Sequence, residues 1–136
     1  MMNKVMPIAA ALLLGLMVCS AVVARNISGY VYFDTAETKP ARCSEVYLWN
    51  GTNCGELQSA RDMTIVDISG YYEFTGLEKG YYSVKAQWGL TICAQCDTTG
   101  TECDTVVLST CEYTVDDTTD ASINLIFDID CECEGN

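Results

Sequence analysis

The sequence contains no histidine and only two prolines among its 136 residues, and nineteen aspartates and glutamates outnumber its seven lysines and arginines. Without histidine the chain lacks the usual general base, the base partner of serine and cysteine nucleophiles, and the commonest metal ligand. The shortage of basic residues leaves no positive patch for a phosphate backbone or an anionic lipid surface. We therefore expect neither an enzyme nor a nucleic-acid-binding protein.

The first 24 residues, MMNKVMPIAAALLLGLMVCSAVVA, are typical of a secretory signal peptide, because one lysine precedes an apolar run that ends in small residues. We expect cleavage after Ala24 and a protein that is secreted or held at the cell surface, with no membrane contact after cleavage. Two alternatives stay open. The apolar run nearly reaches the length of a membrane span, and Cys19 is a candidate for bacterial lipidation, although Val18 stands where a small residue is expected.

Cleavage leaves residues 25–136, enough for one domain with a hydrophobic core and too few for two. This part carries all nineteen acidic side chains and six of the seven basic ones, a formal charge of −13. Such a surface keeps a protein soluble or attracts cations.

The predicted mature chain contains eight cysteines, which behind an export signal indicate a disulfide framework. We expect Cys43 and Cys54, which flank a strand and a turn, to pair locally. Only one residue separates Cys131 from Cys133, so each should join a different partner in the loop of residues 93–111. The eight are Cys43, Cys54, Cys93, Cys96, Cys103, Cys111, Cys131 and Cys133.

The cysteines have two alternative roles. Cys93-Ala-Gln-Cys96 has the spacing of a redox motif, but it lies among acidic residues and outside a βαβ unit, where a thiolate gains no stabilisation. A four-thiolate zinc site would use Cys93, Cys96, Cys131 and Cys133; export favours two disulfides instead.

Alternation of apolar and polar residues predicts short β-strands, with no persistent helical period outside the export signal. Gly-Tyr-Tyr occurs at residues 70–72 and again at 80–82, each time as the start of a strand. We expect Tyr72 and Tyr82 to face the core and Tyr71 and Tyr81 to face outward. The predicted strands are 27–33, 44–50, 63–68, 70–75, 80–86, 104–113 and 121–130.

Seven short strands point to an all-β fold, an antiparallel seven-stranded β-sandwich stapled by disulfides. The stretches ISGYVYFD and DISGYYEFTGLEKGYYSVKA resemble the prealbumin-like β-sandwich family, which includes carboxypeptidase regulatory-like domains and the B-type repeats of bacterial surface adhesins. The resemblance covers residues 27–87 well and 104–130 loosely. The matching positions of the middle motif are Asp67, Gly70, Tyr72, Phe74, Leu77, Gly80, Tyr82 and Val84.

The resemblance implies a spacer, stalk, adhesive or assembly module. Some B-type repeats bind calcium through clustered acidic loops, and weak candidates here are Asp116, Asp117, Asp120, Asp128 and Asp130, although their spacing fits no known calcium loop. Because a lone exported module has nothing to space, we expect a secreted structural protein that self-assembles through its strand edges into a filament or surface layer.

The alternative is a monomeric adhesive or ligand-binding module, with or without calcium, that presents aromatic side chains to a protein or glycan. The contact candidates are Trp49, Tyr71, Tyr81 and Trp88. A third hypothesis, a small exported redox or metal protein, depends on the cysteines alone.

Overall fold

The computed structural model describes residues 24–94 and 96–134; most of the predicted signal peptide lies outside them. In the described part the protein is all-β, with eleven strands in three sheets and one short 3₁₀ turn, Leu57–Ser59. None of the described residues form a helix with the length and hydrophobicity of a membrane span. The strands are β1 (Arg25–Tyr32), β2 (Glu45–Asn50), β3 (Asp62–Ile65), β4 (Tyr71–Leu77), β5 (Tyr82–Trp88), β6 (Asp97–Thr99), β7 (Val107–Leu108), β8 (Glu112–Tyr113), β9 (Ala121–Ser122), β10 (Leu125–Ile126) and β11 (Glu132–Glu134).

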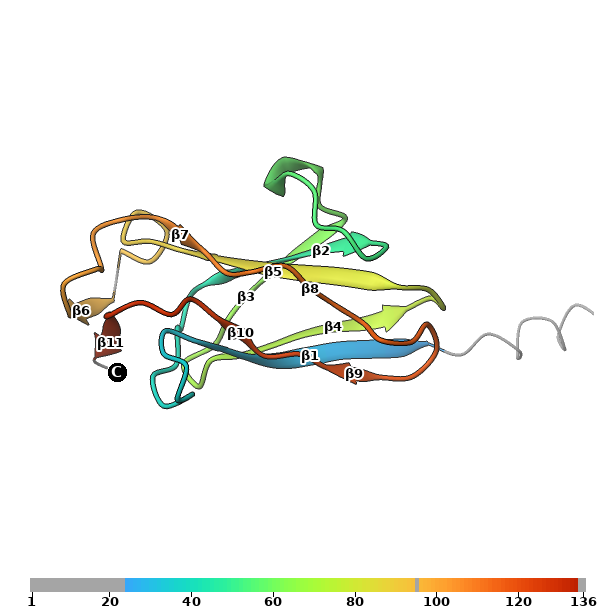
Figure 1. Ribbon diagram of the computed structural model, residues 1–136, viewed down its shortest axis with the longest axis horizontal. Coiled ribbons are helices and arrows are strands. Elements are labelled where there is room, and N and C mark those ends of the chain that lie inside the picture. Colours follow the sequence, from blue (N-terminus) through green and yellow to red (C-terminus); the bar gives the residue numbers. More distant parts are fainter. Residues whose placement is uncertain (1–23, 95, 135–136) are drawn as a thin grey trace, which may run out of the picture.

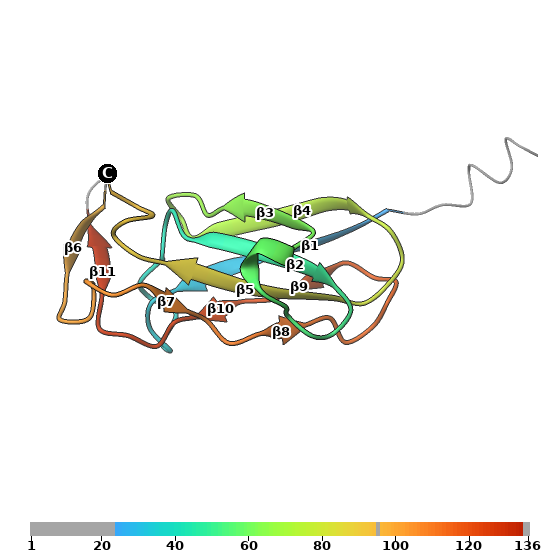
Figure 2. The ribbon, with the colours of Figure 1, turned by 90° about the horizontal axis from the view of Figure 1, so that it is seen from above.

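Two of the sheets form the layers of a sandwich (Figures 1 and 2). In the four-stranded sheet β1 pairs with β4 on one side and with β9 and β10 on the other. In the five-stranded sheet the order is β3-β2-β5, and β7 and β8 both pair with β5. The third sheet consists of β6 and β11 alone and lies at the end of the molecule near the C-terminus (Figure 1).

The expected all-β sandwich with disulfides is confirmed, but the expectation of seven antiparallel strands is wrong. The structure has eleven strands, and β9 and β10 run parallel to β1. Two of the four additional strands, β6 and β11, lie outside the predicted ones, and the other two have a local cause. The predicted strand 104–113 is broken into β7 and β8, and 121–130 into β9 and β10, because each segment leaves its partner strand for a few residues and then pairs with it again.

The core follows the alternation of the central strands. Val46 and Leu48 of β2 and Val84 and Ala86 of β5 are fully buried and face the other sheet, which contributes Tyr72. As predicted, Tyr72 and Tyr82 are buried, whereas Tyr81 is exposed and Tyr71 half-buried. The rings of Phe33 and Trp88 meet edge to face, with centroids 5.0 Å apart, an arrangement that aromatic rings prefer.

The first Gly-Tyr-Tyr follows a tight turn. Gly70 has φ 88°, which only glycine adopts easily, and its amide donates to the Asp67 carbonyl. The Asp67 carboxylate accepts hydrogen bonds from the Ser69 hydroxyl and from the Ser69 and Tyr71 amides, and the Ser69 hydroxyl bond above all lowers the pKa of this carboxyl. These bonds explain the aspartate and the glycine of the motif.

Candidate functional site: the open sides of the sandwich

The two sides of the sandwich are bordered by different strands. Seen from above, β3 and β4 lie along one side, and β7, β8 and β10 lie along the other (Figure 2). β3 pairs only with β2, and β4 only with β1. An edge strand presents backbone amide and carbonyl groups that another strand can pair with, so both sides are candidates for binding a strand.

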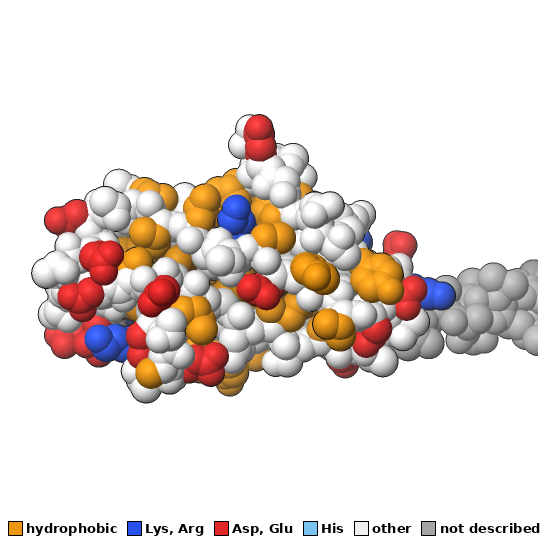
Figure 3. All heavy atoms as spheres, viewed as in Figure 1, with side chains coloured by type: hydrophobic (Ala, Val, Ile, Leu, Met, Phe, Trp, Pro, Cys, Tyr) orange, Lys and Arg blue, Asp and Glu red, His pale blue; other side chains and the backbone are white. Residues whose placement is uncertain are grey.

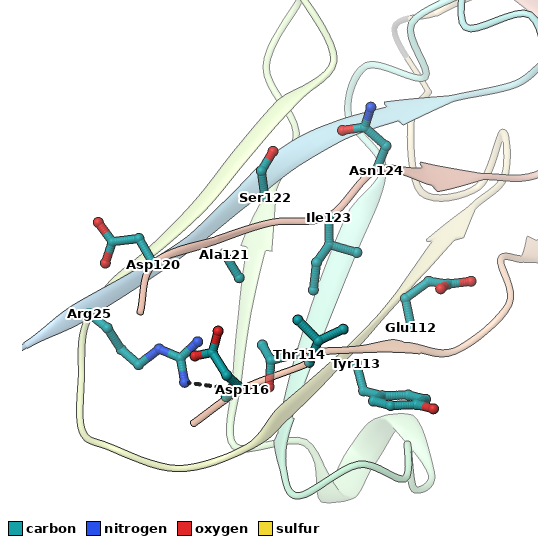
Figure 4. A pocket seen from close by; sticks show the side chains of 11 residues that line it. Arg25, Glu112, Tyr113, Thr114, Asp116, Asp120, Ala121, Ser122, Ile123 and Asn124 are labelled. Atoms are coloured by element: carbon teal, nitrogen blue, oxygen red, sulfur yellow. Dashed lines mark hydrogen bonds between the residues drawn. The ribbon is translucent and has the colours of Figure 1, made fainter. Parts of the chain in front are cut away.

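A groove opens between the two sheets on the β8–β9 side. Its volume is about 440 Å³. The segments that form it run side by side, and Ile123 points from one of them into the space between (Figure 4). The groove runs between the β8 and β9 segments, which face each other. Its lining comprises Arg25, Asp116 and residues 112–115 and 120–124.

A buried arginine closes one end of this groove. Arg25 is only 2% exposed; its Nη1 donates to the Gly80 carbonyl at 2.6 Å and more weakly to the Asp116 carbonyl at 3.4 Å (Figure 4). Its guanidinium carbon lies 5.8 Å from the centre of the Tyr82 ring, within range of a cation–π interaction. Nε and Nη2 are buried without a hydrogen-bond partner, so the guanidinium is incompletely paired.

Asp116 beside it is held in a turn. Its carboxylate accepts hydrogen bonds from the Thr119 amide and hydroxyl and from the Thr118 amide. These bonds, led by the Thr119 amide, lower the pKa of Asp116 to about 2, and the charge of Arg25 adds to the effect. The carboxylate therefore stays ionised at any physiological pH.

Exposed apolar side chains lie on both edge strands of the five-stranded sheet. On β3 these are Met63 and Ile65, 42% and 51% exposed; at the opposite edge they are Leu108 and Tyr113, 49% and 55% exposed. The register places Met63 opposite Tyr47, and successive residues of β2 face opposite sides of the sheet. Since Val46 and Leu48 point into the core, Met63 and Ile65 lie on the outer face.

Leu108 and Tyr113 lie on that same outer face. They pair with Gln87 and Ser83 of β5, which alternate with the core residues Val84 and Ala86. The side of the molecule that bears β7 to β10 shows hydrophobic side chains along its length, between scattered acidic ones (Figure 3). The two edges thus carry apolar groups on one common face of one sheet.

Two of the four predicted contact aromatics are buried, which corrects that prediction. Trp88 is fully buried, because it continues the inward alternation of Val84 and Ala86. Trp49 is 6% exposed because the loop after β2 folds over it, and its indole nitrogen donates to the Glu56 carbonyl at 3.2 Å. Tyr81 is 45% exposed and Tyr71 half-buried.

The structure does not gather the calcium candidates. The Asp116 carboxylate accepts from the Thr119 amide within its own turn. Asp120 accepts from the Asn26 amide, and Asp130 accepts from the Thr101 hydroxyl. Asp117 and Asp128 complete the predicted set. Within residues 24–94 and 96–134, no three carboxylates converge as a set of metal ligands.

All eight cysteines of the domain form disulfides. As predicted, Cys131 and Cys133 join different partners in the 93–111 loop. The expected local bond between Cys43 and Cys54 is wrong: the chain carries Cys43 to the loop after β5 and Cys54 to the start of β8. The pairs and their Cα separations are Cys43–Cys93 (5.7 Å), Cys54–Cys111 (5.9 Å), Cys96–Cys133 (5.5 Å) and Cys103–Cys131 (5.2 Å).

No family model matches the chain, and no curated protein matches it. Among solved structures, a 9R-lipoxygenase from Cyanothece PCC8801 is similar to 74% of this chain, with 14% identity and a TM-score of 0.37. The match spans 16% of that protein's length. At this TM-score the likeness carries no argument about fold or activity.

Proposed function

We propose that the protein is a secreted structural subunit that assembles head to tail, with the β3 edge of one copy pairing with the β7–β8 edge of the next. The observation that carries this proposal is the position of the exposed apolar residues. In such a pairing, Met63 and Ile65 of one copy would become cross-strand neighbours of Leu108 and Tyr113 of the next copy, on one continuous face. Cross-strand apolar pairs of this kind stabilise sheets.

The strand directions support the same arrangement. β3, β2, β5 and the β7–β8 edge alternate in direction across the five-stranded sheet, because every pair in it is antiparallel. A second copy related by translation alone would therefore place its β3 antiparallel to β7 and β8. In the other sheet, β4 of that copy would likewise meet the β9–β10 edge antiparallel, since β9 and β10 run parallel to β1 and β4 runs against it.

The assembly would be open-ended. The two edges differ, so the contact is heterologous, and a heterologous contact that does not close into a ring produces a filament. Four disulfides suit an oxidising extracellular space. We further propose a prealbumin-like sandwich, in which β7 with β8 and β9 with β10 act as two interrupted strands beside β1 to β5.

A charge at either edge should stop assembly without unfolding the domain. Ile65→Glu and Leu108→Glu each place a carboxylate on an exposed, apolar position of an already acidic surface, and edge charges block strand pairing. We expect each variant to stay monomeric by analytical ultracentrifugation at concentrations where the unsubstituted protein forms filaments in electron micrographs. The matched control is Tyr81→Glu. Tyr81 is exposed in the connection between β4 and β5, and this variant should assemble normally.

Mixing the two variants tests the head-to-tail arrangement itself. Ile65→Glu keeps a native β7–β8 edge and Leu108→Glu keeps a native β3 edge, so a mixture should form dimers and nothing larger, whereas each variant alone stays monomeric. Filaments from either variant, or no dimer in the mixture while the control assembles, would contradict this interface. If the unsubstituted protein remains monomeric at every concentration, the assembly proposal itself fails.

Assembly should depend on salt. Copies with a formal charge of −13 repel one another, and the Debye length falls from about 10 Å at 0.1 M to about 3 Å at 1 M ionic strength. We expect the concentration needed for assembly, measured by light scattering, to fall as sodium chloride rises over this range. A rise instead would mean that attraction between opposite charges, rather than apolar pairing, holds the copies together.

The groove favours one other function, a monomeric binding module. Its volume of about 440 Å³ falls in the range of small-ligand sites, and Arg25 at its end has unpaired nitrogens. Ile123 points into the groove (Figure 4). Binding of a small glycan that is lost on Ile123→Ala, by a protein that is monomeric at all concentrations, would select this function instead.

A further inference from the structure

Four cysteine sulfurs gather at the end of the sandwich, from segments far apart in the sequence. The Sγ atoms of Cys93, Cys96 and Cys133 lie within 4.8 Å of one another, and Cys43 is bonded to Cys93. Cys93 and Cys96 are buried and Cys133 is half-buried. The remaining two disulfides lie outside this group, which in the described chain is the one place where three such ligands converge.

We propose that, when its two disulfides are reduced, this group binds one zinc ion through Cys43, Cys93, Cys96 and Cys133. A tetrahedral zinc with Zn–S bonds of about 2.3 Å separates its sulfurs by roughly 3.8 Å. The sulfurs of Cys93, Cys96 and Cys133 already lie within 4.8 Å of one another. Cys43 enters the group through its bond to Cys93, so reduction must let each bonded pair of sulfurs move apart for the site to form. The set differs from the one expected from sequence, because Cys43 replaces Cys131, which is bonded to Cys103.

The backbone around the group suits a metal ligand loop. The Cys96 amide donates to the Cys93 carbonyl at 3.2 Å, and the Cys93 amide donates to the Gly89 carbonyl at 2.9 Å. Cys43 has φ 56°, a conformation that is costly outside glycine and that often marks functional positions. The Cys-x-x-Cys spacing of Cys93 and Cys96 is typical of one half of a four-thiolate zinc site.

A positive charge stands beside the group. The Arg42 Nε donates to the Cys133 sulfur at 3.0 Å, and a neighbouring guanidinium stabilises a thiolate. A zinc ion with four thiolates carries a net charge of −2, which Arg42 would partly offset.

The chemistry is a switch between disulfides and metal. Reduction of the two disulfides to four thiols takes four electrons and four protons. Two dithiol molecules supply both and become cyclic disulfides, whereas two phosphine molecules supply the electrons and become phosphine oxides, with the oxygen and the protons coming from water. Zinc then displaces four protons as the thiolates bind it. Exchange with two molecules of a small disulfide, each of which accepts two electrons and leaves as two thiolates, would re-form Cys43–Cys93 and Cys96–Cys133 and release the ion.

Differential alkylation of the full chain tests this site. The protein is reduced with a phosphine, freed of it, and alkylated with and without Zn²⁺; mass spectrometry then gives the modification at each cysteine. We expect one bound zinc per chain and loss of alkylation at Cys43, Cys93, Cys96 and Cys133, with unchanged alkylation at Cys54, Cys103, Cys111 and Cys131. The same reaction in urea should show no selective protection, which separates a folded site from chelation by an unfolded chain.

Two double variants test which cysteines bind the ion. Cys103→Ser with Cys131→Ser should keep one zinc and the same four protected residues, whereas Cys93→Ser with Cys96→Ser should lose zinc and protection. Unchanged alkylation of the four predicted ligands in the unsubstituted chain would overturn the proposal. Equal protection of Cys103 or Cys131 would also overturn it, since the ion would then bind elsewhere.

Discussion

Alanine at position 29 should destabilise the domain by about 3 kcal/mol, the upper end of the usual cost of overpacking, because the added atom meets backbone that cannot rotate away. A Cβ atom on Gly29 would lie 1.8 Å from the Ile123 carbonyl oxygen, a distance at which the two backbones must separate. That carbonyl also accepts a hydrogen bond from the Tyr72 hydroxyl at 2.8 Å, and the Ile123 amide donates to the Ser28 carbonyl. The substitution should therefore detach the segment of β9 and β10 from β1. Urea unfolding measures the loss.

Gly76→Ala is the matched control. Gly76 has φ 68°, and a Cβ atom added there would meet no atom within 4 Å, so alanine costs only the strain of the left-handed backbone, about 1 kcal/mol. If Gly29→Ala costs no more than this control, then the close crossing of residue 123 over β1 is not a fixed part of the fold. Because β9 and β10 form one open edge, Gly29→Ala should also weaken assembly.

The close approach of Ile123 to Gly29 gives a physical reason for a motif that the sequence alone does not explain. Ser28-Gly29 belongs to the first-strand pattern on which the proposed prealbumin-like fold is based, and the pattern alone predicted a strand. The structure adds the cause: Gly29 lets residue 123 cross at backbone contact. The parallel pairing that follows was not predictable, since alternation specifies the faces of a strand but not its direction or partner.

Burial was predictable where alternation decides it and not where a loop does. Tyr72 and Tyr82 face the core as their period of two requires, and the same period, carried from Ala86 to Trp88, also buries that tryptophan. Trp49 is different. It lies on the outer face of β2, and the loop containing Glu56 covers it through a contact that no periodicity encodes.

Neither the candidate edges nor the cysteine group could be predicted from the sequence. Both depend on which segments become neighbours: β3 and β8 are opposite ends of one sheet only once β2 and β5 are placed between them. Eight cysteines allow 105 pairings, and nearness along the chain misled for Cys43 and Cys54 because each is carried to a segment about fifty residues away.

Replacing Cys54 and Cys111 together by alanine should cost about 4 kcal/mol, the chain-entropy estimate for a cross-link that closes a loop of this length. The bond spans 57 residues and ties the loop after β2 to the residue just before β8. β8 pairs with β5 through only two residues, so this bond is a main restraint on that edge. Urea unfolding of the oxidised variant, with the other three disulfides verified by mass, measures the effect.

Gln58→Ala in the same loop, which removes only an exposed hydrogen bond to Glu56, should change stability by less than about 0.5 kcal/mol. A double variant as stable as Gln58→Ala would mean that β8 is held by its sheet pairing alone. The edge proposed for assembly would then not depend on oxidation.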